Sequence, residues 1–216
     1  MYKAPMLRKL PLLTILLVAV PANAFAGLCF KAADAVPRQE IQLLAGYSPK
    51  TSTLFGTTED RRFLQVGIAY SYHCWNVGQA AVSYTAMFLP LAIIFQPRYS
   101  LNVGGITQEV PAHAVYGISA LPLGFTFDFG RRRSWGAYTD IHGGIIASSE
   151  RVPIDAQNAT GLNFTFDIGG GIRWSLDEGN AIRAGYRFLH ISNAGTTPFN
   201  PGLDNNVLYA SWSFLR

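Results

Sequence analysis

Residues 163–176 read NFTFDIGGGIRWSL and alternate between two kinds of side chain with a period of two residues. One set is large and apolar and consists of Phe164, Phe166, Ile168, Ile172, Trp174 and Leu176. The other set is small or polar and consists of Asn163, Thr165, Asp167, Gly169, Gly171, Arg173 and Ser175. Because successive side chains of a β-strand point to opposite faces, the pattern predicts a strand with one apolar and one polar face.

The same alternation recurs along most of the chain in segments of about ten residues, as it does in membrane β-barrels. We expect eight strands, at residues 40–48, 62–74, 82–96, 114–128, 135–148, 162–176, 180–192 and 206–215. The third segment departs from the alternation because it is apolar from Met87 to Phe95 and contains Pro90, which has no N–H to donate. A β-bulge at Pro90 would reconcile this segment with a strand.

The connections between the expected strands alternate in length. Those after the second, fourth and sixth strands are short, whereas those after the first, third, fifth and seventh are long and polar. Outer-membrane barrels have short periplasmic turns and long external loops. The sequence therefore predicts an all-β fold, an eight-stranded antiparallel transmembrane β-barrel with both chain ends in the periplasm. Strand 180–192 would then end at the outer leaflet.

A soluble β-sandwich or lipocalin-like barrel is the alternative architecture, and it would expose the polar faces to water. Those faces are rich in Gly, Ala and Ser and the opposite faces in Phe and Trp, which favours a lipid-facing exterior around a small polar core. Side chains fill the lumen of an eight-stranded barrel, so we expect no pore. The charged residues expected in the lumen, paired because lone buried charges are costly, are Asp128, Asp140, His142, Asp167, Arg173, Arg183 and Arg187.

The composition agrees with membrane β-structure. Only 14% of the 216 residues are charged, against ~25% in soluble domains. No apolar run approaches the ~18 residues of a membrane-spanning helix. The 17 Lys and Arg include Lys3, Arg8 and Lys9, which lie in a segment expected to be removed; without these three, 14 remain against 13 Asp and Glu. This near balance gives no electrostatic basis for binding nucleic acid.

The first residues have the architecture of a secretory signal peptide. A basic start is followed by the apolar run LPLLTILLVAV and by an A-x-A site at Ala22 and Ala24. We therefore expect a signal peptide at residues 1–24, a periplasmic segment at 25–39 and the barrel at 40–216.

Export to an oxidising compartment permits a disulfide between Cys29 and Cys74, and two unpaired thiols are the alternative. A metal site is not expected at the adjacent His73 and Cys74. Neighbouring side chains of a strand point to opposite faces, so these two cannot converge on one ion.

Strand 180–192 carries the residues with catalytic chemistry. It reads AIRAGYRFLHIS from Ala181, and its alternation assigns Ile182, Ala184, Tyr186 and Phe188 to the lipid face. By the same rule, His190 and Ser192 continue that face. An imidazole and a hydroxyl have no structural reason to face hydrocarbon. Near the end of the strand they would lie where acyl chains meet sugar headgroups.

These residues suggest a serine hydrolase site, because a nucleophile needs a base and the base needs an orienting group. Ser192 can supply the hydroxyl and His190 the base, while Asp204, beyond the next loop, can orient the imidazole. Amide donors for an oxyanion are available in this loop at Asn193, Gly195, Asn200 and Gly202. The alternative is that His190 simply bonds to lipid headgroups, as polar aromatic residues do at membrane interfaces.

At HISNAGTTPFNPG (residues 190–202) the sequence resembles the lipid A 3-O-deacylase (PagL-type) family of Gram-negative outer membranes. The signature is His-x-Ser-Asn followed by an Asn-x-Gly loop. The resemblance implies an eight-stranded barrel with a lipid-facing serine hydrolase site that needs no metal or organic cofactor. It implies catalytic roles for His190, Ser192 and Asp204, and oxyanion-hole roles for Asn200 and Gly195. The family typically has Glu at the position of Asp204, so we expect Asp204→Glu to be tolerated.

The sequence thus predicts an outer-membrane esterase that hydrolyses an ester-linked 3-hydroxyacyl chain of lipid A, with lipopolysaccharide and the outer membrane as its partners. One alternative is a phospholipase or acyltransferase that uses the same barrel surface. A second alternative is a noncatalytic structural or adhesive barrel, which would be indifferent to Ser192→Ala.

Overall fold

The structure is a computed structural model that describes residues 29, 39–130, 133–153 and 159–216. The predicted signal peptide and, apart from Cys29 and Gln39, the predicted periplasmic segment lie outside the described residues. Within the described residues, no helix is long and apolar enough to cross a membrane.

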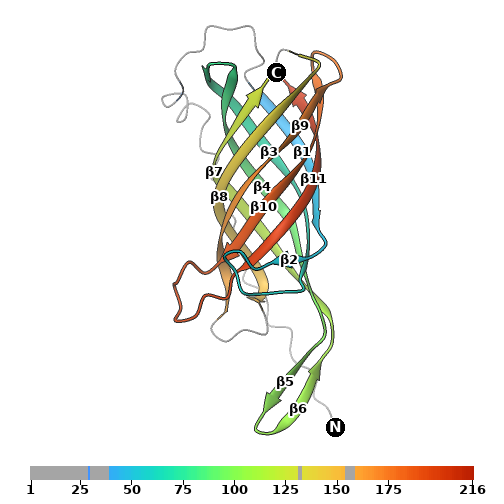
Figure 1. The fold of residues 1–216 in the computed structure, drawn as a ribbon, viewed down its shortest axis with the longest axis vertical. Helices are drawn as coiled ribbons and strands as arrows, with labels where there is room; N and C mark the ends of the chain where they lie inside the picture. Colours follow the sequence, from blue (N-terminus) through green and yellow to red (C-terminus); the bar gives the residue numbers. More distant parts are fainter. Residues whose placement is uncertain (1–28, 30–38, 131–132, 154–158) are drawn as a thin grey trace.

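Eight long antiparallel strands form one closed barrel (Figure 1). They are β1 (Gln39–Ser48), β3 (Arg62–Val77), β4 (Ala80–Gln96), β7 (His113–Phe129), β8 (Trp135–Val152), β9 (Thr160–Ser175), β10 (Asn180–Ser192) and β11 (Leu203–Leu215). Each strand pairs with the next one in this order, and β1 pairs with β11 to close the sheet. The predicted eight-stranded antiparallel barrel is therefore confirmed.

The expected bulge at Pro90 is also present. The register between β4 and β7 shifts between Leu89 and Ala92, so that Pro90 lies where the ladder is interrupted. Three short strands were not predicted: β2 (Thr51–Ser52), and β5 (Tyr99–Val103) and β6 (Ile106–Val110), which form a separate hairpin. The hairpin projects beyond the barrel in Figure 1, at the end opposite to the C-terminus.

The connections divide the barrel into two unlike ends. Those after β3, β7 and β9 are short, whereas β2 and the β5–β6 hairpin lie in the long connections at the other end. The link between β10 and β11 also lies at this end, which we call the outer rim (lower end in Figure 1). His190 at the end of β10 and Asp204 at the start of β11 are therefore both at the outer rim.

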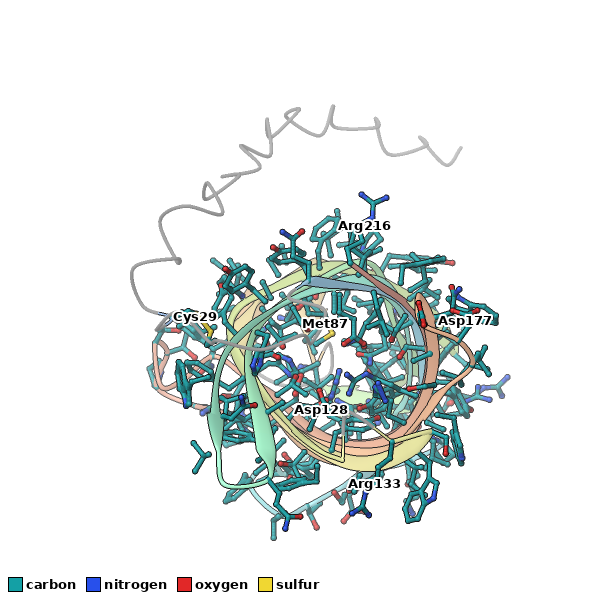
Figure 2. All side chains as sticks on the ribbon, turned by 90° about the horizontal axis from the view of Figure 1, so that it is seen from above. Cys29, Met87, Asp128, Arg133, Asp177 and Arg216 are labelled. Atoms are coloured by element: carbon teal, nitrogen blue, oxygen red, sulfur yellow. A yellow bond between two sulfur atoms is a disulfide. The ribbon has the colours of Figure 1, made fainter. Side chains whose placement is uncertain are left out.

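Side chains sort to the two faces of the barrel as the alternation predicts (Figure 2). Large apolar residues such as Phe164, Phe166 and Trp174 are exposed on the outside, where a membrane would meet them. The seven charged residues predicted for the lumen are all buried: Asp128, Asp140, His142, Asp167, Arg173, Arg183 and Arg187.

Arg183 on β10 pairs with two carboxylates from distant strands. Its guanidinium donates to Glu40 of β1 and to Asp128 of β7 through hydrogen bonds of 3.0–3.1 Å. The same guanidinium lies over the ring of Tyr138, with its central carbon 4.7 Å from the ring centroid. Because all of these groups are buried, each charge depends on its partner for stabilisation.

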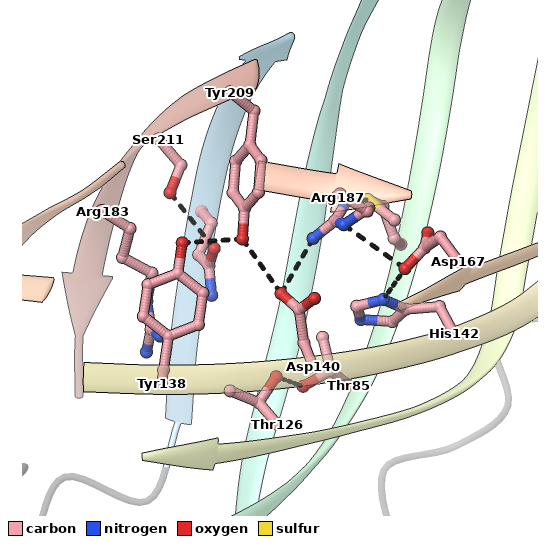
Figure 3. A network of polar contacts seen from close by, with 12 residues as sticks. Thr85, Thr126, Tyr138, Asp140, His142, Asp167, Arg183, Arg187, Tyr209 and Ser211 are labelled. Carbon is pink, nitrogen blue, oxygen red and sulfur yellow. Dashed lines mark hydrogen bonds and ion pairs between the residues drawn. The ribbon is translucent and has the colours of Figure 1, made fainter. Parts of the chain in front are cut away.

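A second network surrounds Arg187, which lies four residues beyond Arg183 on the same face of β10 (Figure 3). Arg187 Nη2 lies 2.9 Å from Asp140 Oδ2, and its Nε lies 3.3 Å from Asp167 Oδ1. Asp167 Oδ1 also bonds to His142 Nδ1 at 2.8 Å, and the Tyr209 hydroxyl donates to Asp140. Side chains on the inner face of β10 thus bond to residues of β1, β7, β8 and β9. These bonds hold β10, whose outer end carries His190, in place.

Cys29 and Cys74 are joined by a disulfide, with their Cα atoms 4.3 Å apart. Cys74 lies near the end of β3 that is opposite to the outer rim. Of the two alternatives that the sequence left open, the structure has the disulfide.

Candidate active site

His190 and Asp204 face each other on adjacent strands at the outer rim. They are register partners in the β10–β11 ladder, and His190 Nδ1 lies 2.6 Å from Asp204 Oδ1. The His190 side chain is 20% exposed and the Asp204 side chain is 0% exposed. Strand pairing alone therefore brings together the predicted base and the predicted orienting acid.

The second oxygen of Asp204 accepts two backbone hydrogen bonds from a different loop. Phe55 N donates to Asp204 Oδ2 at 2.6 Å and Gly56 N donates to the same atom at 2.9 Å. These residues lie between β2 and β3, almost 150 positions away in the sequence. The carboxylate is thus held by three donors. Two of them are neutral amides, which leave its charge uncompensated except by the imidazole.

Ser192 is the last residue of β10 and lies two positions beyond His190, so both belong to the same face of the strand. That face is the outer one. Ser192 is nevertheless only 8% exposed. The sequence predicted a lipid-facing pair, and the structure places both residues on the outer face of β10, with His190 partly exposed and Ser192 buried.

The β10–β11 loop is organised around Asn193. Its backbone N–H donates to Asn200 Oδ1 at 3.2 Å, and its Oδ1 accepts from Gly195 N at 2.9 Å. Its side-chain nitrogen donates to the carbonyl of Phe199. Asn200 therefore uses its oxygen within the loop and keeps its NH₂ group as a donor, whereas the Gly195 amide is already engaged.

Gly202 lies against the edge of the imidazole. A Cβ atom at this position would lie 3.0 Å from His190 Cε1 and 3.0 Å from the Cα of Gly56. Its φ of 53° also belongs to the left-handed region that favours glycine. Glycine at 202 thus permits the close approach of the loop to His190.

The contribution of Phe55 and Gly56 was not predicted from the sequence. Both use backbone N–H groups, which every residue except proline carries, so the residue types give no signal. Their proximity to Asp204 follows from the closure of the barrel by β1 and β11, which brings the first long loop beside the last.

Among the described residues, Asp140, His142 and Asp167 form the one group whose ligand atoms are close enough together to hold a metal ion. Both carboxylates already pair with Arg187, which supplies the positive charge inside this network. The group lies in the lumen, on the opposite face of the barrel wall from His190 and Ser192.

Comparisons with known proteins identify the family and the fold of the chain. The family model of lipid A 3-O-deacylase (PagL) matches residues 31–213. In the solved structure of the outer membrane enzyme PagL, 97% of that chain matches 80% of this one, with 16% identity and a TM-score of 0.55. Neisserial surface protein A matches with 12% identity and a TM-score of 0.48, covering 82% of this chain and 96% of that one. A comparison with curated protein sequences gave no match.

The PagL structure supports the fold, and the family match extends over most of the chain. The family match also decides between a lipid A deacylase and the two alternatives, another lipid enzyme and a noncatalytic barrel, because the family is enzymatic and acts on lipid A. The chain therefore belongs to the lipid A 3-O-deacylase (PagL) family, which comprises outer-membrane β-barrel ester hydrolases that modify lipid A.

Proposed function

We propose that this protein removes an ester-linked 3-hydroxyacyl chain from lipid A, with Ser192 as nucleophile, His190 as general base and Asp204 as the group that orients the imidazole. The observation that carries this proposal is the 2.6 Å hydrogen bond between His190 and Asp204 on the outer face, two residues from Ser192. A nucleophile, a base and an oriented carboxylate are the parts that acyl transfer to serine requires.

The hydrogen bond determines which nitrogen acts as the base. Nδ1 is committed to Asp204, so Nε2 is left to accept the proton of the Ser192 hydroxyl. The serine oxygen attacks the ester carbonyl carbon, and the imidazolium then returns the proton to the departing sugar oxygen. Water, deprotonated by the same nitrogen, hydrolyses the acyl-enzyme to a 3-hydroxy fatty acid and free Ser192. Asp204 stays ionised and stabilises the imidazolium.

The oxyanion of each tetrahedral intermediate needs donors that are already oriented. The Asn200 NH₂ group is one, because Asn193 N–H fixes the other side of the amide. Gly195 N–H is the second donor that the sequence suggests. It joins the site when its hydrogen bond to Asn193 opens, since that bond occupies it here.

The outer face beside these residues suits an acyl chain. Phe166 and Phe164 of β9 are the register partners of His190 and Ser192, and both are exposed on the outside. Phe188 lies on the same face of β10, two positions before His190. An ester at the rim can thus reach Ser192 while its hydrocarbon stays among apolar side chains.

The proposal is tested by expressing the protein in an outer membrane and measuring the mass of the lipid A. We expect the loss of one 3-hydroxyacyl chain with the wild-type protein. Ser192→Ala should abolish the loss, while Ser149→Ala, which changes another serine near the outer end of its strand, should not. Folding of each variant is checked by its heat-dependent migration in gels. Intact lipid A with folded wild-type protein, or fatty acid release from glycerophospholipid alone, would contradict the proposal.

A further inference from the structure

A short segment at the outer rim connects the first long loop to the catalytic strands. We call residues 53–57 the strap. At its start, Ser52 and Thr51 of β2 pair with Asp204 and Asn205 of β11. At its end, Thr57 donates to the carbonyl of Pro201 twice, from its backbone at 2.6 Å and from its hydroxyl at 2.8 Å. The strap is therefore attached on both sides of the Asp204 carboxylate.

Between these attachments the strap makes two kinds of contact with the site. Its Phe55 and Gly56 amides donate to Asp204 Oδ2. Its Phe55 ring meets the His190 ring edge to face, with centroids 5.9 Å apart, and the Phe188 ring with centroids 5.8 Å apart. Both partners of the 2.6 Å hydrogen bond are thus contacted by one loop residue and its neighbour.

The fit of the strap leaves no space for a side chain at Gly56. A Cβ there would lie 2.7 Å from the backbone carbon and oxygen of Gly202, closer than real Cβ atoms approach. Both glycines would therefore have to separate if either carried a side chain. Such a separation would pull the Gly56 amide away from Asp204.

We propose that Phe55 and Gly56 are positioning residues for catalysis: their amides hold Asp204 so that it fixes the His190 ring, and the Phe55 ring restrains the imidazole from the side. This inference rests on the proposed function of His190 and Asp204. Neither residue is required to touch the ester. Their effect should therefore appear in turnover rather than in substrate affinity, because misplacing a catalytic group by about 1 Å can cost ~10²-fold in rate.

Two variants break the amide contacts. Phe55→Pro removes one N–H, and Gly56→Ala forces the strap away from Gly202. Each should lower kcat on lipid A by about 10²-fold with little change in KM. The matched control is Leu54→Ala, since Leu54 and Phe55 are equally exposed, at 68% and 69%, but the amides that donate to Asp204 are those of Phe55 and Gly56. The kcat of Phe55→Ala should lie between that of the control and that of Phe55→Pro, because Phe55→Ala keeps the amide and loses the ring.

Two further readouts separate positioning from a general structural role. The His190 Nδ1 proton in its short bond to Asp204 should give a far-downfield proton NMR signal, identified by its loss in His190→Asn. We expect Phe55→Pro and Gly56→Ala to lose this signal while keeping the folded migration in gels. Labelling of Ser192 by a fluorophosphonate should slow in parallel with kcat. Because labelling needs no lipid A, it also tests the strap if the proposed substrate is wrong. Folded variants with wild-type kcat, or with reduced kcat and an unchanged proton signal, would overturn the inference.

A different observation carries a second inference. A polar cleft of about 520 Å³ lies among the loops of the outer rim, and Thr57 at the end of the strap is part of its lining. Its lining includes four charged residues and two aromatic ones: Glu59, Asp60, Arg61, Arg98, Tyr99 and Phe199. Thr57 and Pro201 also line it, and each is one residue from Gly56 or Gly202 beside the catalytic pair. The cleft is therefore adjacent to the site, although His190, Ser192 and Asp204 are not among its lining residues.

We infer that this cleft binds the phosphorylated amino-sugar headgroup of lipid A, and this inference too rests on the proposed substrate. Its volume falls in the range of ~300–1,000 Å³ for small-molecule sites. Carboxylates and guanidinium groups in equal number suit a ligand rich in hydroxyl and amide groups, and the exposed Arg98 can pair with a phosphate. The position fits as well, because the sugars must lie above the ester and outside the hydrocarbon.

Arg98→Ala and Tyr99→Ala should each raise KM for lipid A several-fold while leaving the fluorophosphonate labelling of Ser192 unchanged. The controls are Arg133→Ala and Tyr116→Ala, an arginine at the opposite end and a tyrosine of β7 that does not line the cleft. The fully deacylated lipid A headgroup should inhibit the wild-type protein and inhibit the two cleft variants less. Equal KM values in cleft and control variants, or equal inhibition of all proteins, would overturn this inference.

Discussion

Two histidine–aspartate pairs lie on opposite faces of the barrel. In the lumen, His142 Nδ1 bonds to Asp167 at 2.8 Å; at the outer rim, His190 Nδ1 bonds to Asp204 at 2.6 Å. The Asp167 carboxylate also pairs with Arg187, whereas Asp204 has neutral amides as its other partners. A charge that already has a guanidinium partner is less able to stabilise an imidazolium that forms during a reaction.

The two histidines also differ in the surroundings of the ring nitrogen that does not bond to aspartate. His142 Nε2 is buried, and no group in the described part of the chain bonds to it. The His190 ring is partly exposed and has Ser192 two positions further along its strand. The same two residue types thus stabilise the lumen as His142 and Asp167 and form a candidate base with its orienting acid as His190 and Asp204. The difference comes from the neighbouring charges and from access to the surface.

The largest expected effect on the deacylation rate is found by replacing each of the two histidines in turn. His190→Asn should lower the deacylation rate by ~10⁴-fold or more, because it removes the proton acceptor. His142→Asn should leave the rate nearly unchanged and act on stability alone. Both are measured by lipid A mass spectrometry over time with equal amounts of folded protein. A large loss of activity in His142→Asn would show that the two pairs are not functionally distinct.

Changes to Asp204 should have the next largest effect. Asp204→Asn should lower kcat by ~10³–10⁴-fold, since a neutral amide cannot stabilise the imidazolium. The structure also changes the expectation for Asp204→Glu: the carboxylate is fully buried and held by three donors, so an added methylene displaces the strap or the imidazole. We now expect a loss of ~10²-fold for Glu.

The control for this prediction is Asp167→Asn in the lumen, which should keep kcat close to the wild-type value. Wild-type turnover in Asp204→Glu would show that the strap is loose enough to accommodate the longer side chain. Turnover is measured with purified lipid A in detergent micelles.

Arg187→Leu addresses stability in the lumen. It leaves the buried Asp140 and Asp167 carboxylates without their guanidinium partner, and breaking a buried ion pair in this way costs about 3–5 kcal/mol. We expect this decrease in the free energy of unfolding, measured by urea titration of protein folded into lipid vesicles. His190→Asn at the rim should change the same quantity much less. Equal stabilities would mean that the lumen network contributes little.

Asn200→Ala removes one donor to the oxyanion and should lower kcat by about 10²-fold, a loss no larger than that expected for Asp204→Glu. Asn206→Ala is the matched control, because Asn206 lies on β11 near the rim and bonds to the Tyr186 hydroxyl instead. An equal rate for both variants would remove Asn200 from the oxyanion hole. The readout is again the deacylation rate at saturating lipid A.

The strands were predictable because alternation is a property of neighbouring residues. Ile182, Tyr186 and His190 share a face whatever the rest of the chain does, since side chains of a strand repeat every two residues. The interior position of Arg183 and Arg187 follows from the same rule. The bulge at Pro90 was predictable as well, because proline cannot donate within a ladder.

The sequence by itself therefore determined the number of barrel strands, the two faces of each of them and the outward position of His190 and Ser192. The tertiary structure decided which distant groups meet: Glu40 with Arg183, and the amides of Phe55 and Gly56 with Asp204. Alternation contains no information about such contacts, because they arise only when β1 pairs with β11 and brings the first long loop beside the last. Backbone amides are common to almost all residues, so only their position in the closed barrel distinguishes these two.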